Sequence, residues 1–454
     1  MTGEFLQFLL QSLKKLMTKI YNPSLEANAT LKERSVWLLY LGALFFILYG
    51  SANQYAFLTS PHESFFMQWE ENIPFIEIFI IPYMSSDILF AIALLLTQTR
   101  FELRVLALRI FITMTFSVFV FVLYPLQFSF VKPETSNFLF SMLELDLAYN
   151  QMPSLHISLA IVLWFSMKEH ISNIFIKSFL AFWFILICLS TLFVYQHHFI
   201  DIPTGAVVGF TVVYLISSKK KTYLTSRFMT PRSLKMSLYY LIGVLISIIL
   251  YFNFNSFIFI YLFLTALSIS FIYAFGFNLL LTNEKSKPNI FQKILFAPYF
   301  IASYFSWNYY KNKIDFKSQL NDNIYFGRQA TKEEYKELEA LGIKTIINLA
   351  NDQQFHKTNI KEIRYPLLDM TMQDPVILHQ IIKTIEKHSN EKIYIHCTLG
   401  MSRSILAISS YLLYKKKSIN EVNEIMNKLR PIYVKSKYMS INLELYEKFI
   451  SKNN

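Results

Sequence analysis

The residues best suited to chemistry lie in one short segment near the C-terminus, residues 396–404, which reads His-Cys-Thr-Leu-Gly-Met-Ser-Arg-Ser. An apolar, β-type run precedes this segment and a helical pattern follows it, so a strand, a tight loop and a helix N-terminus are expected. A loop of this kind directs a row of backbone N–H groups at one small anion. The segment therefore predicts a binding site for a phosphate-sized group.

The polar residues of this segment have predicted roles in phosphoryl transfer. Cys397 lies at the start of the loop, where the helix N-terminus favours the thiolate, which is the form that attacks. Arg403, six residues further on, can direct its planar guanidinium at two phosphate oxygens. Gly400 lets the loop close without a Cβ atom, and Gly400 and Ser402 are expected to bind the phosphate. The Ser404 hydroxyl is expected to help the thiolate leave again.

These residues resemble the Cys-x5-Arg signature of the protein tyrosine phosphatases, and the pattern His-Cys-x2-Gly-x2-Arg-Ser is similar to their dual-specificity branch. The resemblance covers roughly residues 318–450 and implies that a phosphoryl group passes to Cys397. It also implies an upstream acid that protonates the leaving oxygen, and Asp369, 28 residues before the cysteine, matches that position. Asp374 is a less favoured substitute. The alternative is a buried cysteine and a solvated arginine that fall at this spacing by coincidence.

Composition predicts a membrane region before any segment is considered. The chain has 454 residues, of which 54% are hydrophobic and 17% aromatic, and an ordinary globular protein is less apolar than this. The net charge of +12 does not indicate nucleic acid binding, because the lysines and arginines fall in loops between apolar stretches, as in a membrane protein. With two cysteines, no disulfide framework is expected. No cofactor and no metal site are expected either.

Eight apolar stretches are interpreted as membrane spans, although several are shorter than a bilayer requires. They lie at roughly residues 35–50, 74–96, 105–127, 154–168, 176–195, 202–217, 236–252 and 256–281. Residues 4–20 are expected to form an amphipathic interfacial helix, because no positive charge precedes their apolar run as it would in a signal peptide. Residues 289–310, which Lys293 and Pro298 interrupt, are interpreted as an interfacial or re-entrant linker.

The loops between the spans predict the orientation. Residues 51–73 contain no lysine or arginine, and residues 128–152 contain only Lys132. The alternate loops are basic, and the sixth is the most basic, with Lys219, Lys220, Lys221, Arg227, Arg232 and Lys235. By the positive-inside rule the N-terminus is cytoplasmic, and eight spans return the chain to the cytoplasm. If residues 289–310 crossed the membrane, the C-terminal domain would lie outside.

From about residue 315 onward, the pattern predicts an α/β domain. Strand-like and helical segments alternate there. Strands are expected at residues 324–327, 345–349 and 393–395, and helices at residues 332–341, 376–388, 404–415 and 419–429. The predicted fold is therefore a multi-span α-helical membrane bundle of about eight spans, followed by a cytoplasmic α/β cysteine-phosphatase domain.

Two stretches in the apolar half combine residues that can do chemistry together. Pro-Ser-Leu-His at residues 153–156 opens the fourth span, and His197, His198 and Asp201 lie between the fifth and sixth spans. The number of spans places both stretches at the extracytoplasmic face. Ionisable residues are costly to bury at membrane depth, so a functional role is the default explanation.

Together, these stretches resemble the second and third motifs of the type 2 phosphatidic acid phosphatase (PAP2) superfamily. The resemblance implies that His197 attacks phosphorus, and that Asp201 orients this histidine and stabilises its imidazolium. It also implies that His156 protonates the leaving oxygen and that Ser154 holds a phosphate oxygen. A histidine-dependent lipid phosphatase or phosphotransferase is therefore expected in the membrane half.

The match to this superfamily is incomplete. Its first motif, Lys-x6-Arg-Pro, is not recognisable, and Thr191 stands where an arginine is usual, six residues before His197. Fewer cations suit a phosphodiester, as in the inositol phosphorylceramide synthase and sphingomyelin synthase branch, which the membrane half resembles. His198 could replace His197 if the helix were slightly shifted. A membrane anchor with structural histidines is the other alternative.

The predicted domains and function follow from both resemblances. The domains are an amphipathic arm (1–34), a PAP2-like six-span domain (35–217), a basic loop with two further spans (218–282), an interfacial linker (283–317) and a dual-specificity phosphatase domain (318–454). We expect a bifunctional enzyme of phospholipid head-group metabolism in the cell (inner) membrane, with its PAP2 site facing outward. The expected partner is a phospholipid or phosphorylated lipid, with a phosphoprotein as an alternative, and no nucleic acid. The alternative function is a membrane-anchored dual-specificity protein phosphatase.

Overall fold

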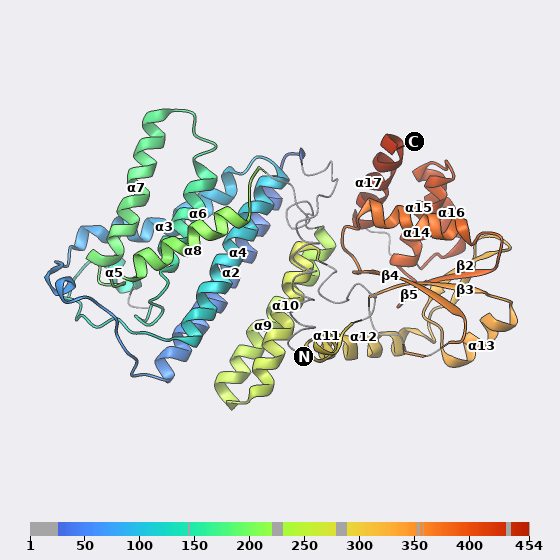
Figure 1. The fold of residues 1–454 in the computed structure, drawn as a ribbon, viewed down its shortest axis with the longest axis horizontal. Helices are drawn as coiled ribbons and strands as arrows, with labels where there is room; N and C mark the ends of the chain where they lie inside the picture. Colours follow the sequence, from blue (N-terminus) through green and yellow to red (C-terminus); the bar gives the residue numbers. More distant parts are fainter. Residues whose placement is uncertain are drawn as a thin grey trace. The chain divides into compact units, whose positions relative to one another are not determined.

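The chain forms two compact units, one within Ser24–Lys221 and one within Thr222–Asn454, here named the helical unit and the C-terminal unit. The computed structural model describes residues 26–143, 146–219, 230–277, 288–351, 355–356, 358–432 and 437–453 (Figure 1). The amphipathic helix predicted at residues 4–20 lies outside the described residues. The same holds for three residues of the predicted basic loop, Lys220, Lys221 and Arg227.

The helical unit consists mainly of long apolar helices. Its main helices are α2 (Leu31–Leu58), α3 (Ile80–Leu96), α4 (Arg100–Leu123), α6 (Leu155–Met167), α7 (Ile174–Phe193) and α8 (Asp201–Leu215). Shorter helical segments are η2 (Gln68–Asn72), η3 (Glu77–Phe79) and α5 (Phe138–Leu143). Each of the first six predicted apolar stretches therefore corresponds to a helix.

Side-chain caps define where the longest of these helices begin. In α2, the Thr30 hydroxyl accepts a hydrogen bond from the Glu33 backbone N–H (3.2 Å), and the Glu33 carboxylate accepts one from the Thr30 N–H (2.8 Å). Thr99 and Glu102 form the same reciprocal cap at the start of α4. Such a capping box satisfies backbone donors that have no partner within the helix. The sequence therefore encodes these helix starts locally.

Close packing of α6 against α8 depends on two glycines one helical turn apart. A Cβ atom on Gly205 would lie 2.6 Å from the Ser154 carbonyl oxygen, and one on Gly209 would lie 2.9 Å from that of Ser158. The Ser158 hydroxyl donates a hydrogen bond to the Gly205 carbonyl oxygen (2.9 Å). Small residues at this spacing let apolar helices approach closely. The packing brings the start of α6 and the start of α8 side by side.

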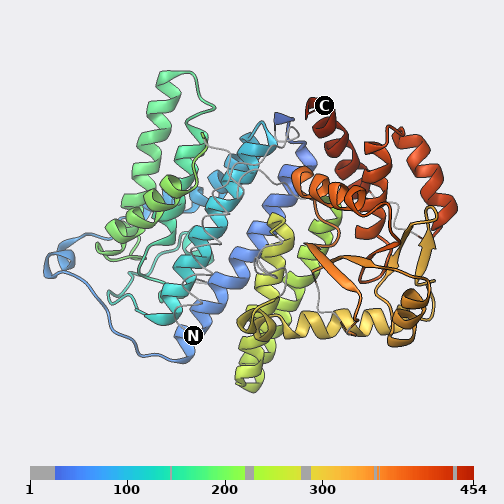
Figure 2. The same ribbon diagram turned by 45° about the vertical axis from the view of Figure 1, so that its right-hand side comes forward.

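The C-terminal unit begins with an antiparallel helical hairpin, α9 (Pro231–Phe254) and α10 (Phe257–Phe275), which Figure 2 shows as two adjacent helices. Asn255 ends α9 in the left-handed conformation, which allows the tight reversal. The hydroxyls of Ser237 and Ser270 each donate to the other residue's carbonyl oxygen at 3.0 Å. These contacts hold the two helices together near the start of α9 and the end of α10.

Among the described residues, six helical segments are long and apolar enough to cross a membrane: α2, η3 with α3, α4, α7, α9 and α10. The apolar helices α6 and α8 are shorter, with 13 and 15 residues. At about 1.5 Å per residue, these two helices are shorter than a bilayer core of about 30 Å. The composition thus indicates a membrane region, and the number of spans and their orientation stay predictions.

Two helices occupy the predicted linker, α11 (Ile290–Leu295) and α12 (Ala297–Tyr310). Phe296 and Phe300 are buried in an apolar cluster with residues of α10. Further along α12, the Trp307 indole N–H donates to the Gln329 carbonyl oxygen (2.9 Å). This part of the chain therefore packs on the hairpin at one end and on the α/β domain at the other.

The α/β domain is built on a sheet whose described strands have the order β1-β2-β5-β3-β4. The strands are β1 (Lys317–Gln319), β2 (Ile324–Arg328), β3 (Thr345–Ala350), β4 (Lys361–Leu367) and β5 (Ile393–Cys397). Only the β1–β2 pair is antiparallel, and the other pairs are parallel. The central strand β5 thus ends at Cys397, with a neighbouring strand on each side.

Helices cover both faces of this sheet (Figure 1). They are α13 (Lys332–Ala340), α14 (Pro375–Lys387), α15 (Arg403–Tyr414), α16 (Ile419–Leu429) and α17 (Lys437–Asn453). Ile324 and Phe326 of β2 are buried in the core that contains α14 to α17, whereas Tyr325 lies in the smaller core with α13. This alternation follows from the two-residue period of a strand. The α/β fold predicted for this region is confirmed.

Candidate active sites

The loop between β5 and α15 surrounds the Cys397 thiol. The side chain is buried, with 2% of its surface exposed. The Gly400 backbone N–H points at Sγ across 3.3 Å, and the Ser404 hydroxyl lies 3.6 Å from Sγ. Both groups can donate hydrogen bonds to a thiolate. The predicted roles of Cys397 and Ser404 are thus compatible with their positions at the end of the central strand and in the first turn of α15.

The Arg403 side chain is buried beside the same loop. One terminal nitrogen donates to Asn351 Oδ1 (2.7 Å) and to the Leu367 carbonyl oxygen (3.1 Å). The other donates to the Thr398 hydroxyl (3.0 Å). These contacts come from the residue that follows β3, from the end of β4 and from the loop itself. They fix the orientation of the guanidinium before any phosphate arrives, which reduces the cost of ordering a long side chain.

Gly400 has a backbone conformation that excludes other residues. Its φ angle is +67°, and an added Cβ would lie 2.5 Å from both the Arg328 nitrogen and the Gly327 carbonyl carbon. The Arg430 Nε donates to the Gly400 carbonyl oxygen (2.6 Å). This bond fixes the peptide unit that follows Gly400, whereas the N–H that points at the thiol belongs to the peptide unit that precedes it.

Asp369 and Ser402 meet at the mouth of this loop. The Ser402 hydroxyl donates to Asp369 Oδ1, and Ser402 is also hydrogen-bonded to the Tyr438 hydroxyl. Asp369 Oδ1 lies 3.7 Å from Arg403 Nε, and the Asp369 side chain is 22% exposed. By contrast, Asp374 caps α14 and accepts from the Val376 N–H (2.9 Å). Of the two carboxylates considered for the acid, Asp369 is therefore the one beside the cysteine loop.

His396, the residue before the cysteine, is fully buried in the sheet. Its Nδ1 lies 3.3 Å from the Cys397 carbonyl oxygen, and its ring stacks on Tyr394 with centroids 5.6 Å apart. Burial lowers the pKa of His396 from 6.5 to about 4, because the charged form is desolvated. The histidine is therefore neutral at pH 7.

In the helical unit, His197 pairs with Asp201. His197 Nδ1 lies 3.0 Å from Asp201 Oδ2, and both side chains are buried. The His156 and His197 rings are 6.0 Å apart between centroids. A carboxylate on Nδ1 fixes the tautomer with Nε2 as the basic nitrogen. The arrangement can therefore activate one histidine as a nucleophile, with a second histidine nearby to exchange a proton.

His198 has a different set of neighbours, although it follows His197 directly. Its Nδ1 lies 3.3 Å from Glu70, and its Nε2 lies 3.2 Å from the hydroxyls of Ser64 and Ser129. Its ring stacks on Phe128 with centroids 4.4 Å apart. Both nitrogens of His198 thus have protein partners.

Ser154 and His156 lie at the start of α6, next to the start of α8. The Ser154 N–H donates to the Asp201 carbonyl oxygen (3.2 Å), so the two motifs meet through the backbone. The Ser154 hydroxyl is buried and has no hydrogen-bond partner among the described residues. The His156 ring packs on Tyr83 of α3, with centroids 4.4 Å apart. The predicted residues Ser154, His156, His197 and Asp201 are therefore close together.

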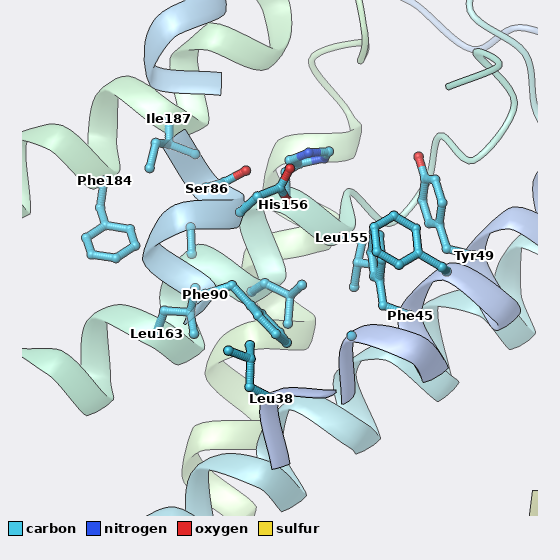
Figure 3. Close-up of a pocket in the computed structure, with 15 residues that line it drawn as sticks. Leu38, Phe45, Tyr49, Ser86, Phe90, Leu155, His156, Leu163, Phe184 and Ile187 are labelled. Atoms are coloured by element: carbon cyan, nitrogen blue, oxygen red, sulfur yellow. The ribbon is translucent and has the colours of Figure 1, made fainter. Parts of the chain in front are cut away.

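His156 also lines a cavity of about 260 Å³ among α2, α3, α6 and α7. Figure 3 shows the Ser86 hydroxyl and the His156 ring near one end, with apolar side chains such as Leu38, Phe90 and Leu163 around the rest. Asp87 of α3 lines this cavity as well. A cavity that is mostly apolar with a polar end suits a molecule with a hydrocarbon part.

Several residues at the two sites were not predicted from the sequence. Asn351 and Arg430 hold the cysteine loop, and Glu70 holds His198. Asp146 accepts from the Tyr49 hydroxyl (3.0 Å), and burial raises its pKa to about 6. Asn351, Arg430 and Glu70 are distant in sequence from the motifs that they contact. The one local signal that could have been used is the Gly-x3-Gly spacing in α8.

Comparison with known families concerns only the C-terminal unit. Residues 324–449 match the family described as "Dual specificity phosphatase, catalytic domain". This match includes the cysteine loop and Asp369 and leaves the helical unit unassigned. No curated protein matches the chain.

Several solved structures resemble the same part of the chain. Tk-PTP in its active form is 21% identical and covers 29% of this chain and 97% of its own, with a TM-score of 0.28. Human DUSP28 is 16% identical and covers 30% of this chain and 99% of its own, with a TM-score of 0.28. PTPMT1 in complex with PI(5)P is 16% identical and covers 31% of this chain and 100% of its own, also with a TM-score of 0.28.

Proposed function

Since residues 324–449 form a dual-specificity phosphatase catalytic domain and the protein is a phosphatase, we propose that it is a bifunctional membrane enzyme of phospholipid head-group metabolism. The C-terminal domain hydrolyses a phosphomonoester. The helical unit carries a separate, histidine-dependent site of the PAP2 type. The two parts of this proposal rest on different observations.

In the C-terminal domain, the reaction proceeds through a phosphocysteine. Cys397 Sγ attacks phosphorus, and an S–P bond forms as the bond to the ester oxygen breaks. Asp369 gives its proton to that oxygen, and Arg403 and the loop N–H groups bind the phosphoryl oxygens. Water then attacks phosphorus and loses a proton to Asp369, while the Ser404 hydroxyl stabilises the departing thiolate. Free phosphate and the dephosphorylated alcohol are the products.

A lipid substrate is supported by the contact between the phosphatase domain and the hairpin. The Thr230 hydroxyl, at the start of α9, lies 3.1 Å from the Met370 carbonyl oxygen, next to Asp369. Helices α9 and α10 are both apolar enough to cross a membrane. The contact with the phosphatase domain is therefore made at one end of this hairpin, where α9 begins. An active site held at the end of a membrane hairpin lies near the lipid head groups. This proximity raises the effective concentration of a lipid substrate at the site.

The charge of the cysteine loop narrows the substrate class. Residues 398–402, Thr-Leu-Gly-Met-Ser, contain no lysine or arginine. Arg403 is therefore the cation of the loop that pairs with phosphate. This favours a lipid with a single phosphomonoester over a head group that carries several phosphates.

In the helical unit, we assign His197 as the nucleophile, Asp201 as its orienting carboxylate and His156 as the acid. The 3.0 Å contact between His197 and Asp201 supports this assignment, as does the buried, unpartnered hydroxyl of Ser154. The cavity beside His156 offers an apolar site for part of a lipid chain. The reaction is transfer or hydrolysis of a phospho-head group, consistent with the small number of cations near the histidines.

The second candidate function is a membrane-anchored protein phosphatase. It is favoured by the match of residues 324–449 to the dual-specificity phosphatase catalytic domain, which gives no information on the helical unit. In that case the helical unit serves as an anchor, and the buried histidines stabilise the bundle.

The two functions are separated by a substrate comparison with the full-length protein in lipid vesicles. Phosphate release is measured in a His197→Ala background, which removes the proposed histidine site, from phosphatidic acid in the vesicles and from phosphotyrosine and phosphoserine peptides in solution. We expect faster release from the lipid, complete loss in Cys397→Ser, and retention in the matched control Cys188→Ser. A preference for the peptides by orders of magnitude would contradict the lipid assignment.

A further inference from the structure

The segment that carries Asp369, residues 368–374 (the acid loop), is tied to the phosphatase domain on one side. The Gln373 N–H donates to Asn442 Oδ1 of α17 (2.6 Å). The Gln373 side-chain amide donates to the Leu368 carbonyl oxygen (2.7 Å). These bonds fix both ends of the acid loop and leave its middle, around Met370, to be held by other contacts.

The membrane hairpin supplies contacts to the middle of the acid loop. The Thr230 hydroxyl lies 3.1 Å from the Met370 carbonyl oxygen, and Arg232 Nε lies 3.2 Å from the Met370 sulfur. Leu368 is completely buried in an apolar cluster with Ile269, Ile272 and Tyr273 of α10, Phe296 between α11 and α12, and Phe300 of α12. Backbone and side-chain atoms on both sides of Asp369 thus rest on elements outside the phosphatase sheet.

The backbone at Met370 explains why such contacts are needed. Its φ angle is +60°, in the left-handed region that a residue with a long side chain rarely adopts. A strained residue keeps this conformation only when its surroundings impose it. The turn at Met370 aims the preceding side chain, Asp369, at the cysteine loop, where it meets Ser402 and Arg403.

We propose that Thr230 and Arg232, at the N-terminus of α9, are positioning residues for the general acid. By holding Met370 in its turn, they keep the Asp369 carboxyl over the leaving oxygen, and they make acid catalysis depend on the membrane hairpin. This inference rests on the proposed function, in which Asp369 is the acid.

Leaving-group dependence provides the test, because a good leaving group departs without protonation and a poor one does not. The full-length protein in vesicles is assayed with 2,4-dinitrophenyl phosphate and with an alkyl phosphate. A misplaced acid lowers kcat/KM for the alkyl phosphate and leaves kcat/KM for the dinitrophenyl ester nearly unchanged, because kcat/KM covers only the steps up to formation of the phosphocysteine, before Asp369 acts on water. A general loss of folding lowers both rates together.

The variants separate the contact with Met370 from the stability of α9. Thr230→Val removes the hydroxyl and also the N-cap, since the Ser233 N–H donates to Thr230 Oγ1 (3.1 Å). Ser233→Ala weakens the same capping box and leaves the hydroxyl beside Met370, so it is the matched control. Thr230→Ser keeps the hydroxyl and should restore the rate. The control for Arg232→Ala is Lys235→Ala. The Lys235 ammonium lies over the Tyr239 ring on the same helix.

We expect Thr230→Val and Arg232→Ala to lower kcat/KM for the alkyl phosphate about tenfold, which is part of the roughly 10²- to 10⁴-fold that a positioned general acid supplies. Ser233→Ala, Thr230→Ser and Lys235→Ala should change it by less than about twofold. Asp369→Asn should lower it by about 100-fold or more. If Thr230→Val does not fold, Arg232→Ala, which lies outside the capping box, carries the test.

Two results would overturn different parts of the argument. If Asp369→Asn shows the leaving-group dependence and both hairpin variants do not, the positioning role is wrong and the acid assignment stands. If Asp369→Asn affects both substrates equally, Asp369 is not the acid, and the proposed mechanism fails with it.

Discussion

His197 and His198 are adjacent in the sequence, and their side chains have different partners. Asp201 binds Nδ1 of His197, whereas Glu70, Ser64 and Ser129 surround His198. A nucleophile needs one ring nitrogen available to phosphorus, and His197 meets this requirement.

We therefore predict that His197→Gln abolishes head-group release or transfer by the helical unit, because the imidazole oriented by Asp201 is lost. His198→Gln should keep a measurable rate, since it alters a supporting hydrogen-bond network. The measurement is release of labelled head group from phospholipid vesicles. Loss in His198→Gln alone would show that the nucleophile was assigned to the wrong histidine.

The buried His396 predicts how stability depends on pH. In the unfolded chain it binds a proton near pH 6.5, and in the folded domain only near pH 4. Between these values the unfolded state binds more protons, so the free energy of unfolding decreases as the pH falls. The full effect is roughly 3 kcal/mol at 1.36 kcal/mol per pKa unit.

His396→Asn should therefore lose less stability than the wild type between pH 7 and pH 5. The full-length protein is titrated with urea at each pH, and limited proteolysis measures the fraction in which the phosphatase domain is unfolded. An equal loss in both proteins would mean that another group controls the acid sensitivity.

At the scale of elements, the contact between α6 and α8 brings the membrane motifs together. Gly205 faces the Ser154 carbonyl oxygen, where a Cβ would lie at 2.6 Å. Gly205→Ala should separate the helices and cost about 1–3 kcal/mol, as overpacking usually does. Head-group activity should fall, and phosphomonoester hydrolysis by the C-terminal domain should stay.

Gly50→Ala in α2 is the control for this prediction, because a Cβ there meets nothing within 4 Å. Alanine favours the helix over glycine by about 1 kcal/mol, so this variant should raise the thermal midpoint slightly. A Gly205→Ala protein with unchanged midpoint and activity would contradict the close packing.

Elements with a strong local pattern could be predicted from the sequence. The apolar stretches, strands β2, β3 and β5, and helices α13 to α16 have a clear period or cap, and each is present. Strand β4, with Lys361, Glu362 and Arg364, and the three-residue β1 have no such pattern. Their pairing depends on the neighbouring strands, which a local pattern does not reveal.

The candidate sites show the same division between local and distant residues. The motifs identified Cys397, Arg403 and the histidines, because these residues are close together in the sequence. Asn351 contacts Arg403, Arg430 contacts Gly400 and Glu70 contacts His198, each across 30 or more residues of sequence. Such partners become visible only when the fold brings the segments together.

At the scale of the whole molecule, the orientation of the chain decides which lipids each site can reach. The basic loops predict a cytoplasmic phosphatase domain and an outward-facing histidine site. Asn423 in α16 is exposed on the phosphatase domain, and Val131, 90% exposed, lies in a predicted outer loop.

With Cys188→Ser and Cys397→Ser as background, a membrane-impermeant maleimide on intact cells should label Val131→Cys and leave Asn423→Cys unlabelled. After the cells are opened, both should react. Labelling of Asn423→Cys in intact cells would place the phosphatase domain outside and require an additional crossing of the membrane.

The central claim is that one chain carries two independent phosphoryl-transfer sites. The most direct measurement uses wild type, Cys397→Ser, His197→Ala and the double variant in vesicles with a labelled phospholipid panel, with and without polyol acceptors. Free phosphate and new lipid or released head group are quantified separately. We predict that Cys397→Ser loses only phosphate release from monoesters, and that His197→Ala loses only head-group release or transfer. Loss of every activity in Cys397→Ser, with none lost in His197→Ala, would contradict the claim and reduce the helical unit to an anchor.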